Sequence, residues 1–291
     1  MSRPVGTRGS EVTFDGEVGR LAGQLWLTSD AGRPLVVLAH GGGQTRHSWR
    51  RTAERLADGG STVVTFDARG HGDSDWSSDG RYEFEDLAVD VAHVVRQARL
   101  RTGRDRVVLV GASMGGASSM MALAADPDLA DALVLVDVTP KVEVAGIERI
   151  HRFVTAAPDG FEDLEAVGRA VSAYNPHRKN PGNLDGLRKN LRRRDNGRWY
   201  WHWDPAFFSS RPGATPQDLQ EPLERAAGRI TRPTLLVRGT ASDIATEDGV
   251  DLLRTLIPQA RVADVAGAGH MVTGDDNDVF AASLEEFLVE L

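Results

Sequence analysis

Five short apolar runs rich in β-branched residues recur along the chain, and amphipathic segments separate them. The runs are Leu35–Leu38, Thr62–Phe66, Val107–Val110, Leu133–Val136 and Thr234–Val237. Segments with the spacing of a buried helical face lie between them at Trp49–Leu56, Phe84–Leu100 and Met114–Ala125. Strands that alternate with helices favour a parallel sheet covered on both faces. We therefore predict an α/β fold with a mostly parallel central sheet, preceded by an antiparallel hairpin of Glu11–Phe14 and Gln24–Thr28.

Residues 139–228 interrupt this alternation. Their helical patterns are broken by six prolines at positions 158, 176, 181, 205, 212 and 216. This composition predicts a helical cap at 139–228, inserted into a core made of residues 1–138 and 229–291.

Composition restricts the partners of the chain. The net charge of −8 over 291 residues argues against a nucleic-acid or membrane-surface partner, so we expect a small-molecule substrate. The absence of cysteine excludes a thiolate metal site and a cysteine nucleophile, and we expect neither a metal nor a cofactor. The polar, glycine-rich start lacks the apolar stretch of a secretory signal, which favours a cytoplasmic protein. No sequence pattern specifies an oligomeric state.

The candidate nucleophile is Ser113. It lies between a buried strand and a helix, inside the pattern Gly-x-Ser-x-Gly formed with Gly111 and Gly115. A sharp strand-to-helix turn exposes such a serine above the sheet, and the small flanking residues remove the clashes that side chains would create.

A serine hydroxyl needs a base and a carboxylate that orients the base. Of the eight histidines, His270 follows the strand-like run Arg261–Val265 in a loop of small residues, and we predict it as the base. The acid should follow a strand and precede this histidine. Asp243, just after Thr234–Val237, fits best; Asp137, at the end of Leu133–Val136, and Asp248 are the alternatives.

Backbone N–H groups are the candidates for binding an oxyanion. Three glycines follow the first parallel strand in Leu38-Ala-His-Gly-Gly-Gly-Gln, which lets the backbone approach a ligand closely. Gly42 and Met114, the latter at the start of a helix, are the predicted donors.

An aromatic segment in the cap, Trp199-Tyr-Trp-His-Trp, has two interpretations. Its rings either pack the cap onto the core or line a substrate pocket. In an extended backbone Trp199, Trp201 and Trp203 would share one face, and these three are the candidate substrate-binding residues.

Together these motifs resemble the α/β-hydrolase superfamily. The resemblance rests on HGGG at 40–43, DARGHGDSD at 67–75, GASMGG at 111–116, Asp243 and GAGHM at 267–271. It covers essentially the whole chain, most weakly in the cap. It points to the branch with a serine nucleophile, which includes esterases, enol-lactonases, carbon–carbon bond hydrolases and perhydrolases. Epoxide hydrolases and haloalkane dehalogenases resemble the chain overall but carry aspartate where it has Ser113.

The resemblance implies a serine esterase or lactonase that uses a catalytic triad, a nucleophile elbow and an oxyanion hole. Carbon–carbon bond cleavage or another lyase or perhydrolase reaction could use the same triad. A non-catalytic ligand receptor on the same fold is the third hypothesis, because fold does not dictate function.

Overall fold

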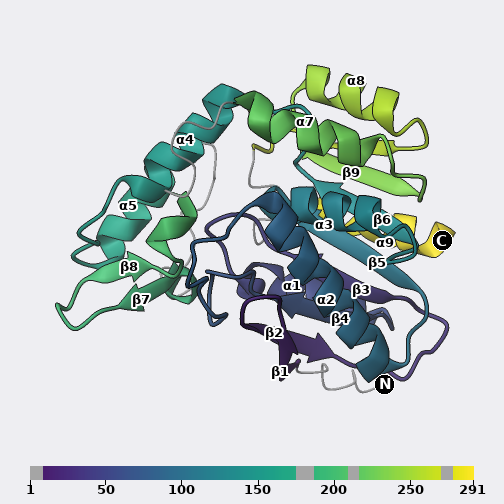
Figure 1. Cartoon of the computed structure of the whole chain (residues 1–291), viewed down its shortest axis with the longest axis horizontal. Helices are drawn as coiled ribbons and strands as arrows, with labels where there is room; N and C mark the ends of the chain where they lie inside the picture. Colours follow the sequence, from purple (N-terminus) through teal and green to yellow (C-terminus); the bar gives the residue numbers. More distant parts are fainter. Residues whose placement is uncertain (1–8, 175–186, 209–215, 270–277) are drawn as a thin grey trace.

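The computed structural model describes residues 9–174, 187–208, 216–269 and 278–291. Its centre is an eight-stranded sheet with the order β1-β2-β4-β3-β5-β6-β9-β10 (Figure 1). The strands are β1 (Ser10–Asp15), β2 (Arg20–Trp26), β3 (Leu35–Ala39), β4 (Thr62–Phe66), β5 (Val107–Ala112), β6 (Ala132–Val136), β9 (Thr234–Gly239) and β10 (Arg261–Val265). The first two pairings, β1 with β2 and β2 with β4, are antiparallel, and the others are parallel. The predicted α/β fold is confirmed.

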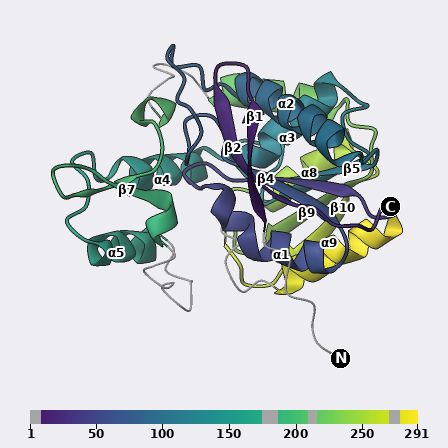
Figure 2. The ribbon, with the colours of Figure 1, turned by 90° about the horizontal axis from the view of Figure 1, so that it is seen from below.

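Helices cover both faces of this sheet (Figure 2). They are α1 (Arg50–Asp58), α2 (Phe84–Thr102), α3 (Met114–Ala125), α7 (Pro216–Ala227), α8 (Glu247–Leu256) and α9 (Asp278–Glu290). One apolar cluster joins the sheet to α2, α3, α7 and α8, and a second joins it to α1 and α9. The strands between these clusters are buried on both faces, which explains why they are continuous apolar runs without alternation.

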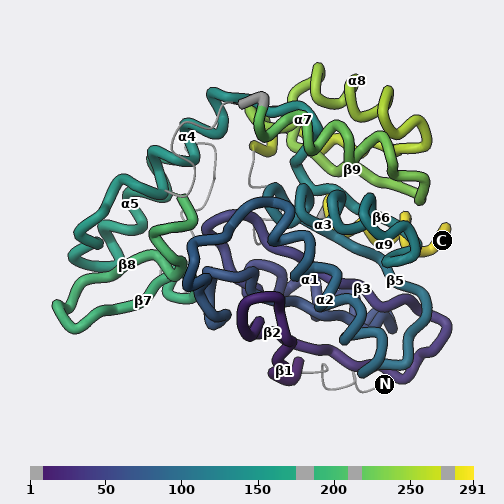
Figure 3. Tube along the Cα trace, in the orientation of Figure 1, coloured from purple at the N-terminus to yellow at the C-terminus, as the bar shows by residue number. Residues whose placement is uncertain are grey.

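The described part of the predicted cap at residues 144–174 and 187–208, for which we keep the name cap, lies beside the sheet and its helices (Figures 1 and 3). It contains α4 (Val144–Thr155), α5 (Leu164–Tyr174), and a two-stranded antiparallel sheet of β7 (Leu191–Arg193) and β8 (Trp199–Trp201). Short 3-10 turns span Arg46–Trp49 in the core and Arg188–Asn190 and Pro205–Phe208 in this region. The sequence predicts a helical cap and leaves the backbone of the aromatic segment open between helical and extended. The hairpin forms because aromatic residues favour strands and Gly197, with φ of 77°, allows the turn.

The helix α7 falls within the range predicted for the cap but packs on the core. It contacts α3, and its Leu223, Ala226 and Ala227 belong to the larger apolar cluster. The division into core and cap stays a prediction, with α7 on the core side by its contacts. No helix in the described ranges is long and apolar enough to span a bilayer.

Truncation of matched apolar residues tests the place of α7. Leu223 is 3% exposed, whereas Ile147 on α4 is 38% exposed. Leu223→Ala should lower the free energy of unfolding by about 2–5 kcal/mol, because it opens a cavity in the main core. Ile147→Ala should cost less than about 1 kcal/mol. Urea denaturation measures both, and equal small losses would place α7 outside the core.

Candidate active site

The strand β5 passes into α3 through one residue in a strained conformation. Ser113 has φ of 47° and ψ of −117°, which a non-glycine residue adopts only when its surroundings hold it there. A Cβ atom on Gly115 would lie 2.5 Å from the carbonyl oxygen of Ala39, and Gly111 packs equally closely on the start of α3. The N–H of Ser113 donates to the carbonyl of Val136 over 3.0 Å. The predicted strand-to-helix turn is therefore present.

Two backbone N–H groups beside this elbow make no hydrogen bond to the described part of the chain. They belong to Gly42 and Met114, the residues predicted as oxyanion donors. The two residues are adjacent, since a Cβ atom on Gly42 would lie 3.9 Å from Cβ of Met114. Met114 is the first residue of α3, where the helix dipole adds positive potential. Two adjacent free donors fit a developing negative charge.

Two buried histidines fix the loops around the elbow. The Nε2 of His40 accepts from the N–H of Ala68 over 3.0 Å, and the Nε2 of His71 accepts from the N–H of Gly43 over 3.1 Å. Each Nδ1 donates to a nearby backbone carbonyl. Both rings are therefore neutral. Burial is the main cause that lowers the pKa of His40 to about 4 and that of His71 to about 3.

Asp67 ties the same loops together. Its buried carboxylate accepts from the N–H groups of Arg46 at 2.6 Å and Asp73 at 2.9 Å, and it pairs with the Arg46 guanidinium. That guanidinium also reaches Asp73 over 2.9 Å. Burial opposes the charge of Arg46, but the two carboxylates outweigh it and raise its pKa. The motif at 67–75 is thus a structural clamp for loops at the carboxyl edge of the sheet.

The two candidate acids have different surroundings. Asp137 is 1% exposed, and its carboxylate accepts from the N–H of Gly239 over 3.0 Å and from the hydroxyl of Ser242 over 2.6 Å. The side chain of Asp243 is 42% exposed, and its two oxygens accept from one guanidinium, that of Arg149 on α4, over 2.7 and 2.6 Å. Asp243 therefore joins the core to the cap.

Sequence reasoning missed Arg149. It lies 94 residues before Asp243, and no motif connects the two. Burial opposes its charge, but the hydrogen bond to Asp243 raises its pKa. The guanidinium also lies 4.7 Å from the ring centre of Tyr174, at the end of α5. No pattern in the sequence distinguishes Arg149 from Arg152 on the same helix.

The predicted base, His270, lies outside the described residues. The chain just before it is anchored to the end of β9, because the carbonyl of Ala268 accepts from the N–H of Ala241 over 2.9 Å. Gly239 packs against the same segment and donates to Asp137. The chain that leads to His270 therefore runs close to Asp137.

The aromatic segment of the cap is extended from Trp199 to Trp201, and Trp203 pairs with His71 after a bend at His202. The rings of Trp201 and Trp203 stack at 5.0 Å with an angle of 9°. Trp203 also covers the glycine loop, since a Cβ atom on Gly43 would lie 3.1 Å from its indole. Trp199 packs in an apolar cluster within the cap. Of the three candidate binding residues, Trp203 is thus the one in contact with the loop of the predicted oxyanion hole.

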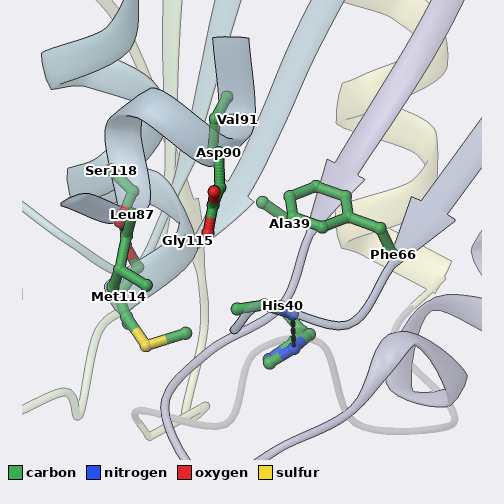
Figure 4. Close-up of a pocket in the computed structure, with 10 residues that line it drawn as sticks. Ala39, His40, Phe66, Leu87, Asp90, Val91, Met114, Gly115 and Ser118 are labelled. Atoms are coloured by element: carbon green, nitrogen blue, oxygen red, sulfur yellow. Dashed lines mark hydrogen bonds between the residues drawn. The ribbon is translucent and has the colours of Figure 1, made fainter. Parts of the chain in front are cut away.

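A small cavity lies behind the elbow (Figure 4). Its volume is about 10 Å³, room for no more than one water molecule. It is lined by Ala39, His40, Phe66, Ala68, Leu87, Asp90, Val91, Met114, Gly115 and Ser118. This space is too small for a substrate. In the ranges that the structure describes, no group of three histidine or acidic side chains is arranged to hold a metal ion.

Comparison with known proteins identifies the family. Residues 34–276 match the family model of the α/β hydrolase fold. The chain belongs to the α/β hydrolase fold family. It is 32% identical over 253 residues to an esterase of Mycobacterium tuberculosis, covering 83% of this chain and 78% of the esterase. It is 29% identical over 276 residues to 2-(acetamidomethylene)succinate hydrolase of Mesorhizobium japonicum, covering 94% of this chain and 93% of that hydrolase.

Solved structures agree with this assignment. The crystal structure of E-2-(acetamidomethylene)succinate hydrolase superposes with a TM-score of 0.81 at 26% identity, covering 97% of this α/β hydrolase and 99% of that chain. A structure of the Mycobacterium tuberculosis esterase gives a TM-score of 0.75 at 27% identity, with 97% and 92% covered. This α/β hydrolase is therefore a hydrolytic enzyme.

The neutral buried histidines predict acid sensitivity. Below its usual pKa of about 6.5 a histidine binds a proton in the unfolded chain, while His40 and His71 stay neutral in the fold until about pH 4 and 3. The contribution of each neutral histidine to the free energy of unfolding should be fully present above pH 6.5. It should fall as the pH is lowered, by up to about 1.4 kcal/mol per pH unit for each histidine. Urea denaturation between pH 6.5 and 5 measures the slope. His40→Gln should reduce it, and an unchanged slope would contradict the prediction.

Proposed function

We propose that this α/β hydrolase cleaves an ester or lactone of a small organic molecule through an acyl-enzyme on Ser113. The observation that carries the proposal is the strained elbow of Ser113 beside the two free N–H groups of Gly42 and Met114. A hydroxyl at the end of a helix dipole, next to two donors, suits attack on a carbonyl whose oxygen becomes negative. The relative named as an esterase supports the same reaction class.

The reaction proceeds in two halves. The oxygen of Ser113 attacks the substrate carbonyl while His270 takes the hydroxyl proton, and the N–H groups of Gly42 and Met114 bind the oxyanion. The intermediate expels the alcohol, which receives the proton from His270. Water then attacks the acyl-enzyme with His270 again as base, and the carboxylic acid leaves as Ser113 regains its proton.

Asp137 is the acid that the contacts favour. A carboxylate that stabilises an imidazolium must be held in place and keep its charge available. Asp137 is buried, fixed by Gly239 and Ser242, and close to the chain that leads to His270. The charge of Asp243 is compensated by Arg149. We therefore propose Asp137 in this role, with Asp243, which the sequence favours, as the alternative.

An acylated dicarboxylate is the second substrate class. One relative is named a 2-(acetamidomethylene)succinate hydrolase, and Arg149 places a cation at the carboxyl edge of the sheet. A substrate carboxylate there would compete with Asp243 for that guanidinium. Turnover of p-nitrophenyl esters, lactones and N-acyl dicarboxylates in parallel distinguishes the classes. The cytoplasmic location stays a prediction.

Replacement of the nucleophile tests the reaction. Ser113→Ala should lower kcat by roughly four orders of magnitude or more, because the nucleophile is lost. The free energy of unfolding should stay unchanged or rise, because a strained residue at this position is kept for the reaction and not for packing. The matched control is Ser119→Ala on the same helix, whose buried hydroxyl has no hydrogen-bond partner among the described residues. It should keep full activity. A fluorophosphonate probe should label the wild type and Ser119→Ala only; a Ser113→Ala variant with a tenth of the activity would exclude the assignment.

Amide substitutions distinguish the two acids. Asp137→Asn should lower kcat by several orders of magnitude, because an amide cannot stabilise the imidazolium. Asp243→Asn should change kcat far less and cost about 1 kcal/mol or less in stability, since its ion pair with Arg149 is partly exposed. Steady-state kinetics and urea denaturation of both variants provide the measurement. If Asp243→Asn proves the more damaging to kcat with its fold intact, the acid is Asp243.

A further inference from the structure

We propose that His71 is a positioning residue for the oxyanion hole and that it links the cap to the loop that carries Gly42. The inference rests on the proposed function, because it assigns a role to Gly42 in acyl transfer. It follows from two contacts that His71 makes in opposite directions, one through its ring and one through its backbone. The sequence alone does not distinguish His71 from a histidine that is buried without such contacts.

The ring of His71 fixes the peptide that follows Gly42. Its Nε2 accepts from the N–H of Gly43 over 3.1 Å, and its Nδ1 donates to the carbonyl of Arg69 over 3.1 Å. Gly43 has φ of 73°, so the loop turns sharply at this point. With the Gly43 N–H engaged by the ring, the preceding N–H, that of Gly42, is the one left beside Met114. The acceptor on His71 therefore selects which donor serves the oxyanion.

The backbone around His71 binds the cap. The N–H of Gly72 donates to the carbonyl of His202 over 2.8 Å, and the N–H of Asp204 donates to the carbonyl of Gly70 over 2.7 Å. These two bonds place His71 opposite Trp203 as an antiparallel pair. The same three-residue segment thus holds the cap by its backbone and the oxyanion loop by its side chain.

Trp203 closes the link from the cap side. Its indole lies against Gly43, at 3.1 and 3.2 Å from the position of a Cβ atom, and it is 6% exposed. The rings of His71 and Trp203 lie 6.4 Å apart, and Phe207 packs edge-on to His71 at 4.7 Å. His71 is fully buried, so water cannot easily replace its acceptor for the Gly43 N–H. A displacement of Trp203 is therefore transmitted to Gly43 through direct contact.

The experiment distinguishes the effect of the hydrogen-bond acceptor on the His71 ring from the effect of simply filling the space with a buried side chain. His71→Leu removes the acceptor, whereas His71→Gln can place an amide oxygen near the position of Nε2. The matched control is His93→Leu on α2, a histidine whose ring hydrogen-bonds to the carbonyl of Asp15 over 3.3 Å and not to the glycine loop. Kinetics on a p-nitrophenyl ester and inhibition by a trifluoromethyl ketone, which forms an oxyanion on the serine, are measured for all three.

His71→Leu should lower kcat by about 10- to 100-fold with KM nearly unchanged, because a misplaced donor is felt in the transition state. The Ki of the ketone should rise by a similar factor. His71→Gln should recover kcat to within about tenfold of the wild type, and the control His93→Leu should keep it within about threefold. A His71→Leu variant with wild-type kcat and Ki overturns the inference, as does a Gln variant no better than the Leu variant.

A second measurement needs no activity. Nitrogen-15 correlation spectra of the histidine-labelled wild type, assigned with His71→Gln, should show His71 neutral with its proton on Nδ1 near pH 7. A proton on Nε2 would remove the acceptor and overturn the inference even in an active esterase. If the wild type cleaves no ester and Ser113 fails to react with a fluorophosphonate, the proposed function fails instead, and the spectra still test the link to Gly43.

Discussion

The close packing of Gly115 against the end of β3 is the constraint on which the rest of the site depends. A Cβ atom at this position would lie 2.5 Å from the carbonyl oxygen of Ala39, so the first turn of α3 touches the chain where β3 becomes a loop. That contact brings Met114 beside Gly42. Any larger residue would push the helix away and separate the two N–H groups. The proposed reaction thus depends on this backbone contact as well as on the hydroxyl of Ser113.

Burial of the surrounding loops determines how their polar residues are used. A buried polar group is costly without a partner, and a buried charge more so. His71 meets this condition as a neutral ring with a donor and an acceptor, and Asp67 meets it through Arg46. The buried charge of Arg69 also has a partner, because its guanidinium pairs with the buried Asp90 over 2.6 Å. The polar motif at 67–75 therefore fixes the geometry around the nucleophile, and burial keeps its His71 neutral by lowering the pKa of the ring to about 3.

Features encoded by neighbouring residues could be predicted from the sequence, and features made by distant residues could not. The run 62–66 and the helix 114–125 match the structure to the residue, because periodicity and the elbow glycines are local signals. The order of residues admits both Asp137 and Asp243 as the acid, since each follows a parallel strand. Contacts with distant residues distinguish their surroundings: Gly239 and Ser242 hold the buried Asp137, and Arg149, 94 residues away in sequence, pairs with Asp243. The same holds for the pairing of Trp203 with the loop at 70–72.

Two junctions between cap and core differ in physical kind, and this difference determines how the cap responds to its surroundings. The pair of Arg149 with Asp243 is partly exposed, with 36% and 42% of the side chains accessible, so salt screens it and its contribution is small. The pairing of His71 with Trp203 rests on backbone hydrogen bonds and buried rings, which salt hardly affects. Ionic strength therefore acts mainly on the ion pair of Arg149 with Asp243 and hardly on the backbone pairing of His71 with Trp203. Arg192 adds a charged contact to that pairing, since its guanidinium donates to the carbonyl of Gly72 over 2.8 Å and lies 3.7 Å from Asp73. The loop that carries Gly42 is thus held mainly by backbone hydrogen bonds and buried rings.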